Sequence, residues 1–255
     1  MIKQPFRLHT KHLEVGYSHI PVVSDIDFAL HPGEILTIIG PNGSGKSTIL
    51  KSLAKQLVPL QGFIYIEDLS LQKISETDLP KQVAVVLTER PQPELMTCTD
   101  VVAIGRYPYT GKLGLLREHD QNQIHKALML VDAIELKDRY FLELSDGQKQ
   151  RIMLARALCQ EPDIIILDEP TSFLDIRYAV QILDILTRLA KEQQITIIIS
   201  LHELSYAKRI ADLVMCIKDG QVVHLAKPDA IFNEQIISNL YDLPPGLYHQ
   251  IFGGL

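Results

Sequence analysis

The most informative stretch of the chain is Gly40-Pro41-Asn42-Gly43-Ser44-Gly45-Lys46-Ser47-Thr48, which matches the pattern G-x-x-x-x-G-K-[ST]. It follows an apolar run at residues 35–39 and leads into a predicted helix at residues 47–57. Glycine has no Cβ, so the loop can turn its backbone N–H groups toward an anion. The partly positive helix N-terminus points at the same place. The stretch therefore predicts a phosphate-binding loop between a strand and a helix.

Two side chains of this loop suggest its ligand. Lys46 offers a positive charge to the β- and γ-phosphates of a nucleotide, and the Ser47 hydroxyl can bind Mg²⁺. From average residue frequencies, this pattern arises by chance in about one chain of this length per hundred. The flanking strand and helix make a chance match rarer still. We therefore predict a nucleotide site rather than a glycine-rich turn without function.

Composition and charge narrow the class of protein. The 255 residues are 46% hydrophobic and 22% charged, as in soluble globular proteins with one large α/β domain or two smaller ones. No apolar run approaches the roughly 18–20 residues that cross a bilayer, and the N-terminus lacks an apolar signal core. We expect a cytoplasmic protein. A net charge of −6 argues against broad nucleic-acid binding, and the three scattered cysteines argue against a disulfide framework or structural zinc.

The segment before the loop predicts short strands joined by turns, because polar and apolar residues alternate at 6–10, 12–15 and 24–30. Tyr17 follows the second of these strands. In a hairpin beside a nucleotide site, a tyrosine either packs against its neighbours or stacks on adenine, and the sequence leaves both open.

A change of character begins after the strand predicted at residues 82–87. Proline and glycine gather in residues 88–118, which predict a loop with a short helix near 99–104, and the apolar period of residues 118–131 predicts a longer helix. We interpret residues 88–160 as a mainly helical insert in an α/β domain.

A second candidate for anion contact is Leu144-Ser145-Asp146-Gly147-Gln148. Ser145 and Gln148 form a capping box, which predicts a helix from Ser145 to about Cys159. Gly147 costs a helix about 1 kcal/mol relative to alanine. A glycine here therefore indicates that something large approaches the backbone at this helix N-terminus.

Polar side chains also follow two apolar strands predicted further along the chain. Asp168 and Glu169 end the run at residues 163–168, where ligand sites of parallel α/β sheets lie. Asp168 suits Mg²⁺, and Glu169 is placed to accept a proton from an attacking water. His202 follows the strand at 195–199 and falls at the same edge. Asp175 is the predicted N-cap of an amphipathic helix.

Four motifs resemble, in order and spacing, those of the nucleotide-binding subunit of ABC transporters: the loop at 40–48, residues 144–148, residues 164–170 and His202. The resemblance covers essentially the whole chain. It implies an α/β P-loop NTPase fold in a single domain with a RecA-like core, an N-terminal antiparallel β-subdomain and an inserted α-helical subdomain. Residues 1–87 and 161–255 would form the core and β-subdomain, and about 88–160 the helical subdomain.

The resemblance also implies how the site works. Two copies would pair head-to-tail as a homodimer and trap two ATP molecules, with Tyr17 stacking on adenine and His202 orienting water against Glu169 beside Lys46. The residues acting in trans would be Ser145, Gly147, Gln148 and Asp175.

The chain departs from the family at two places. Asp146 stands where glycine is commoner, at a helix N-terminus that tolerates an acid. Thr88 and Glu89 stand where the family has a glutamine that contacts Mg²⁺ or water. The Mg²⁺ ligands implied are Ser47 and Asp168, with either Thr88 or Glu89 in the glutamine's place.

A narrower resemblance lies at Gly105-Arg106-Tyr107-Pro108, which is similar to an element of importers for iron–siderophore complexes, haem and cobalamin. It implies a peripheral subunit on the cytoplasmic face of the inner membrane, bound to permease subunits, serving a substrate-binding protein indirectly and binding no nucleic acid. We expect the permease to dock on residues 88–117. The alternatives are a soluble ATPase of this class in DNA repair or translation, and an exporter subunit.

Overall fold

The computed structural model describes residues 5–87, 93, 95–111, 114–244 and 246–252. Its strands are β1 (Leu8–Tyr17), β2 (Ile20–Ile26), β3 (Ala29–Leu30), β4 (Ile35–Ile39), β5 (Gln61–Ile66), β6 (Leu69–Ser70), β7 (Val83–Val86), β8 (Ile164–Asp168), β9 (Thr196–Ser200), β10 (Leu213–Lys218) and β11 (Gln221–Ala226). Its helices are α1 (Lys46–Leu53), α2 (Leu79–Gln82), α3 (Cys98–Ala103), α4 (Glu118–Leu130), α5 (Asp146–Leu158), α6 (Ile176–Gln193), α7 (Leu204–Ile210), α8 (Pro228–Ile231), α9 (Glu234–Tyr241) and α10 (Leu247–Phe252). Short 3-10 turns are η1 (Leu71–Lys73), η2 (Ile104–Arg106), η4 (Ile134–Leu136) and η5 (Phe141–Glu143).

The strands form one mixed sheet in the order β6-β5-β1-β2-β11-β10-β4-β9-β8-β7, and β3 pairs with β1. Strands β10, β4, β9, β8 and β7 run parallel to one another, and β1 pairs antiparallel with β2, β3 and β5. Every residue of β4, β8 and β9 is buried, which explains why these strands consist mostly of isoleucine and leucine.

The antiparallel part differs from the sequence prediction in its strand bounds. Two strands predicted at 6–10 and 12–15 are one continuous strand, β1, with register irregularities near Leu13. His12 adopts a left-handed φ of 46° at this irregularity. The strand predicted at 24–30 is split into β2 and β3, and the Thr10 hydroxyl bridges the break by donating to Ile26 O and accepting from Phe28 N. The alternation of polar and apolar residues predicts separate strands here, whereas a β-bulge lets one strand continue and stay paired across the irregularity.

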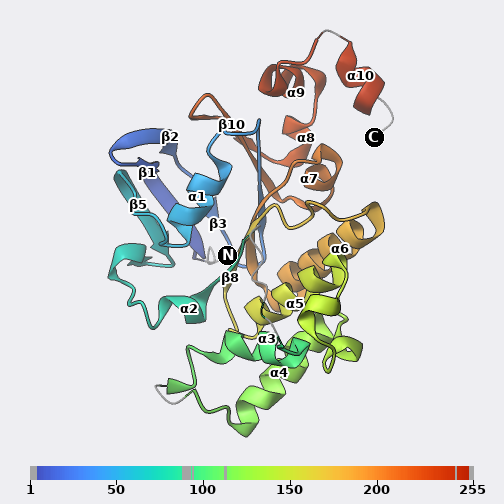
Figure 1. Ribbon diagram of the computed structural model, residues 1–255. Coiled ribbons are helices and arrows are strands. Elements are labelled where there is room, and N and C mark those ends of the chain that lie inside the picture. The colour runs from blue at the N-terminus through green and yellow to red at the C-terminus, as the bar shows by residue number, and fades with distance from the viewer. Residues whose placement is uncertain (1–4, 88–92, 94, 112–113, 245, 253–255) are drawn as a thin grey trace.

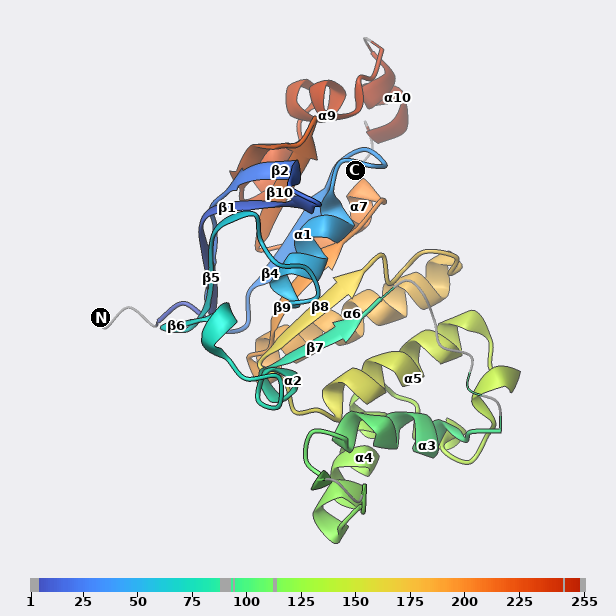
Figure 2. The same cartoon turned by 60° about the vertical axis from the view of Figure 1, so that its left-hand side comes forward.

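The sheet divides the apolar core in two. Figures 1 and 2 show the strands between α1 on one side and helices α3 to α6 on the other. Alternate residues of β8 point to opposite faces: Ile165 and Leu167 pack with α3, α4, α5 and α6, whereas Ile164 and Ile166 pack with α1 and the antiparallel strands. The helices predicted between residues 99 and 159 therefore share one core with the sheet face they cover. The division of the chain at residues 88 and 160 stays a prediction.

One buried ion-pair network links the helices between Cys98 and Leu158, which we call the helical segment. Arg106 in η2 is 1% exposed and donates from Nε to Asp120 Oδ1 of α4 at 2.9 Å. Its Nη1 donates to Cys159 O at 2.7 Å, at the end of α5, and to Glu161 Oε2 at 2.8 Å. A Cβ on Gly105 would lie 2.3 Å from Arg156 O, so glycine lets η2 lie directly on α5. The Gly-Arg-Tyr-Pro element therefore joins η2, α4 and α5.

No helix in the described ranges is long and apolar enough to cross a membrane.

We predict that Arg106→Met destabilises the fold by about 3–5 kcal/mol, because it leaves Asp120 buried without its counter-charge. Urea unfolding of the purified protein measures the change. The matched control is Arg209→Met, which removes an exposed pair with Asp184 and should cost about 0–1 kcal/mol. Equal losses in the two variants would show that the Arg106 network does not hold the helical segment.

Candidate active site

The carboxyl ends of three neighbouring parallel strands place the candidate residues together. β4 leads into Gly40, β8 ends at Asp168, and β9 ends at Ser200. In the sheet register Ser200 pairs with Asp168 on one side and with Ile38 on the other. The phosphate-binding loop and the segments that start at Glu169 and Leu201 therefore leave the sheet side by side.

A cleft of about 500 Å³ lies at this edge. Its lining comes from the β1–β2 hairpin, the glycine-rich loop, the first turn of α1, and the ends of β8 and β9. The lining residues are Tyr17, Val22, Asn42, Gly43, Gly45, Lys46, Ser47, Thr48, Glu169 and His202. Residues distant in the sequence thus converge here, and Tyr17, 46% exposed, forms part of the wall.

The local conformation of the loop requires glycine at its end. Gly45 has a φ of 103°, and a Cβ there would lie 2.3 Å from Val23 Cγ2 of β2. With that turn, α1 begins at Lys46 and presents its N-terminus to the cleft. The helix ends at Leu53 instead of the predicted residue 57, because Lys55 turns into a left-handed conformation with a φ of 59°.

Lys46 is the charged group at the base of the cleft. Its side chain is held between the loop and the sheet, the residue is 5% exposed, and its ammonium donates to Gly40 O at 2.9 Å and to Pro41 O at 3.0 Å. Burial lowers the pKa of Lys46, and the nearby carboxylates of Glu169 and Asp168 oppose that shift. A buried ammonium beside two acids favours a polyanionic ligand that reaches it together with a cation.

Ser200 joins the two acids and was not singled out from the sequence. Its hydroxyl donates to Asp168 Oδ1 at 2.7 Å and accepts from the backbone N–H of Glu169 at 2.9 Å. The available signal was a hydroxyl residue ending the isoleucine-rich strand that precedes His202. That hydroxyl reaches the two acids only because β8 and β9 are neighbours in the sheet.

Glu169 and His202 form a close pair. His202 Nε2 lies 2.5 Å from Glu169 Oε1, and the Ser172 hydroxyl donates to Glu169 Oε2 at 3.3 Å. The backbone of Glu169 has a φ of 49°, a left-handed conformation that is uncommon for a residue with a side chain. Such strain gathers at functional sites, where surrounding contacts hold it.

The residues expected to act in trans lie elsewhere. The predicted capping box is confirmed at the N-terminus of α5: Ser145 N donates to Gln148 Oε1 at 3.1 Å, and Gln148 N donates to Ser145 Oγ at 3.4 Å. Asp175 caps α6 by accepting from Tyr178 N at 3.0 Å, as predicted. Neither Ser145, Gly147, Gln148 nor Asp175 is among the described residues that line the cleft.

The candidate metal ligands are only partly described. Thr88 and Glu89 lie outside the described residues, so the choice between them stays open. Ser47 lines the cleft, and Asp168 is 9% exposed with Oδ1 fixed by Ser200. Within the described part of the chain, no group of three or more His, Cys, Asp or Glu side chains could hold a metal.

The fold and the cleft define an α/β P-loop nucleotide hydrolase with an ATP-binding site. Residues 23–172 match the family model for the ABC transporter domain, which is more than half of the chain. The protein belongs to the ABC transporter ATP-binding family and is an ATPase of that family.

Three relatives of known sequence are similar over nearly the whole chain. An ABC transporter ATP-binding protein of Methanocaldococcus jannaschii is 44% identical, covering 96% of this chain and 85% of the relative. The petrobactin import ATP-binding protein of Bacillus anthracis is 36% identical, covering 92% and 86%. The iron(3+)-hydroxamate import ATP-binding protein of Bacillus subtilis is 33% identical, covering 92% and 88%.

Solved structures agree with this assignment. CbiO1 of Clostridium perfringens, part of an ABC transporter complex, has a TM-score of 0.80 and 28% identity, covering 97% of this chain and 99% of that chain. The cassette MJ0796, a dimer in a post-hydrolysis state bound to ADP and Pi, has a TM-score of 0.74 and 25% identity, covering 87% and 98%.

We predict that Ser200→Ala lowers the kcat for ATP by about 10–100-fold, because Asp168 and the Glu169 backbone lose the hydroxyl that aligns them. Steady-state phosphate release measures it. Ser52→Ala is the matched control: Ser52 is also a fully buried serine, but its hydroxyl has no partner in the described structure, so its ATPase should equal the parent's. A parent-like kcat in Ser200→Ala would remove Ser200 from the site.

Proposed function

We propose that this ATPase drives import of an iron–siderophore complex, haem or cobalamin through a membrane permease. The observation that carries the ATP chemistry is the convergence of Lys46, Glu169 and His202 on one cleft. The importer class is supported by the relatives named for petrobactin and iron(3+)-hydroxamate import. The Gly-Arg-Tyr-Pro element has a structural role through Arg106, so the substrate class rests mainly on these relatives.

The cleft accounts for the binding of ATP in cis. Backbone N–H groups of residues 40–48 and the N-terminus of α1 surround the phosphates. Lys46 exchanges its hydrogen bonds to Gly40 O and Pro41 O for β- and γ-phosphate oxygens, which match its charge. Tyr17, at the open wall, stacks on adenine.

Mg²⁺ fits the donors that are described. Ser47 and Asp168 offer oxygen ligands only, and Mg²⁺ in nucleotide sites usually takes one or two protein ligands together with phosphates and water. Bound there, Mg²⁺ would neutralise developing charge on the phosphates.

Hydrolysis follows from the Glu169–His202 pair. Glu169 accepts a proton from the attacking water. The water oxygen then bonds to the γ-phosphorus, and the bond between that phosphorus and the oxygen that leaves with ADP breaks. His202, 2.5 Å from Glu169 Oε1, fixes that carboxylate and contacts the γ-phosphate. The hydrogen bond from Ser172 to the other carboxylate oxygen limits the rotation of Glu169 further.

A second copy of the chain completes the site. The capped N-terminus of α5 and the loop before α6 do not line the cleft of their own chain, so they are available to the cleft of a head-to-tail partner. Ser145, Gly147, Gln148 and Asp175 would then close over the γ-phosphate of that partner. The dimeric cassette that this fold resembles supports the pairing.

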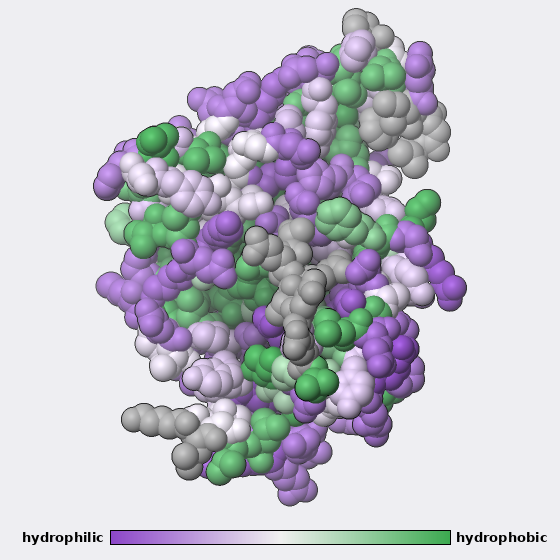
Figure 3. Space-filling view, viewed as in Figure 1, coloured by the Kyte–Doolittle hydropathy of each residue, from purple (hydrophilic) through white to green (hydrophobic). Residues whose placement is uncertain are grey.

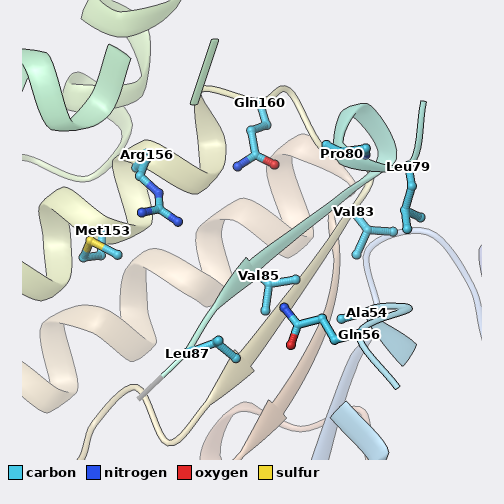
Figure 4. A pocket seen from close by; sticks show the side chains of 10 residues that line it. All are labelled: Ala54, Gln56, Leu79, Pro80, Val83, Val85, Leu87, Met153, Arg156 and Gln160. Carbon is cyan, nitrogen blue, oxygen red and sulfur yellow. The ribbon is translucent and has the colours of Figure 1, made fainter. Parts of the chain in front are cut away.

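We further propose that the permease docks on residues 88–117 and on a groove of about 430 Å³ between the sheet and the helical segment. Figure 4 shows Met153 and Arg156 of α5 on one side of the groove and Val83 and Val85 of β7 on the other. Figure 3 shows apolar surface in the hollow on this side of the molecule. The side chain of Arg156 has no hydrogen-bond or ion-pair partner in the described structure, and burial lowers its pKa, so the groove suits a partner segment that brings an acidic or carbonyl oxygen.

We propose that the protein is a peripheral subunit on the cytoplasmic face of the inner membrane. It binds the permease directly, serves a substrate-binding protein only through it, and needs no nucleic acid.

We predict that Glu169→Gln forms an ATP-bound dimer and hydrolyses ATP at least about 100-fold more slowly than the parent, because the base is lost while charge and shape are nearly kept. Size-exclusion chromatography with ATP and phosphate release measure the two effects. The control is Glu203→Gln, a neighbouring carboxylate at the same sheet edge that does not line the cleft, which should hydrolyse ATP at the parent rate. Parent-rate hydrolysis by Glu169→Gln would exclude Glu169 as the base.

We predict that a cysteine at position 107 cross-links to the permease in the assembled complex. Tyr107 is 76% exposed on the predicted docking face, and the three native cysteines are buried, so the new thiol is the reactive one. Phe63→Cys, 54% exposed on β5, is the control and should not cross-link. Equal capture by both variants, or capture by Phe63→Cys alone, would place the docking face elsewhere.

A further inference from the structure

Gly147 has no room for a side chain, and its own subunit is the reason. A Cβ built on Gly147 would lie 2.5, 2.8 and 2.9 Å from three carbons of Tyr178, namely Cγ, Cδ1 and Cβ. These distances are shorter than any ordinary carbon–carbon contact, so the tyrosine lies directly on the backbone of the first turn of α5. The sequence indicated a close approach at this glycine, and the group that approaches in this structure is an aromatic ring of α6.

Tyr178 sits where two capped helices meet. Its backbone N–H donates to Asp175, the N-cap of α6, and its ring covers the turn that Ser145 caps at the start of α5. Figures 1 and 2 both place the first turns of α5 and α6 side by side. One side chain therefore fixes the distance and orientation between the α5 N-terminus and the loop before α6.

We infer that Tyr178 is a positioning residue that holds these two trans-acting elements as one rigid surface. The inference rests on the proposed function, in which Ser145 and Asp175 meet the nucleotide of a second copy. If the two elements moved independently, each closing event would have to order both of them. A ring packed on a bare backbone removes that freedom beforehand, and such preorganisation favours closure and alignment.

The competing account assigns the glycine at 147 entirely to the nucleotide of the partner. Under that account, replacing Gly147 harms closure to the same extent with or without Tyr178. Under ours, part of the effect of Gly147→Ala is a clash with the ring and disappears when the ring is removed. A double-mutant cycle distinguishes the two accounts because the residues are in direct contact.

The test uses Gly147→Ala, Tyr178→Ala, the double variant and Tyr178→Phe in the full-length protein. Thermal unfolding without nucleotide measures the clash: Gly147→Ala should lower the Tm, and the same change in the Tyr178→Ala background should not lower it further. In steady-state ATP hydrolysis, Tyr178→Ala should lower kcat by about tenfold or more, and Tyr178→Phe should keep the parent kcat because the ring remains. The affinity of the monomer for ADP should stay at the parent value in both Tyr178→Ala and Tyr178→Phe, since Tyr178 does not line the cleft.

The outcomes separate this inference from the proposed function. If the parent protein hydrolyses ATP and dimerises but Tyr178→Ala does so equally well, the positioning role is wrong and the proposed function stands. An equal loss of Tm from Gly147→Ala in both backgrounds also overturns the inference. If the Glu169→Gln protein never dimerises with ATP, the proposed function fails first. Should Gly147→Ala not fold, the contrast between Tyr178→Ala and Tyr178→Phe still decides the positioning role.

Discussion

The constraint on which this structure depends is the burial of a positive charge at the end of a parallel sheet. Lys46 is almost inaccessible, so its ammonium needs oxygen partners, which it takes from the loop carbonyls of Gly40 and Pro41. The carboxylates of Asp168 and Glu169 support the charge from the end of β8, which β9 separates from β4 in the sheet. That is possible only because β4, β9 and β8 are adjacent and parallel, so their carboxyl ends meet. The order of the strands, the conformation of the loop and the burial of the Lys46 charge therefore depend on one another.

Much of this arrangement could be predicted because its determinants are local. The glycine-rich loop, the capping box at Ser145 and the cap at Asp175 each depend on residues within a few positions of one another. Ser200 and Tyr178 could not be found in the same way, because each acts across a contact between distant segments. Asp168 and Ser200 become neighbours only through the pairing of β8 with β9, and Gly147 and Tyr178 only through the packing of α5 on α6. Strand bounds near His12 failed for a related reason, since a bulge is set by the partner strand.

The Gly-Arg-Tyr-Pro element shows how a motif can be recognised for one reason and exist for another. From the sequence it marked a subclass of importers. In the structure Arg106 is a buried cation that binds Asp120, Glu161 and the terminal carbonyl of α5. An arginine at that carbonyl also meets the negative end of the α5 dipole. The element thus fixes the far end of the same helix whose N-terminus carries Ser145.

The helix α5 is consequently held at both ends, and this bears on how a site divided between two subunits can work. At its C-terminus Arg106 binds the last turn, and at its N-terminus Tyr178 covers Gly147. The cleft beside Lys46 is open to water, which screens the interactions of its charges with the γ-phosphate. In the proposed dimer, a second copy would bring a rigid pair of helix N-termini over that cleft and expel water, so each remaining dipole and charge would act more strongly on the γ-phosphate. In that proposed dimer, rigidity of the covering surface would let closure itself act as the switch for hydrolysis.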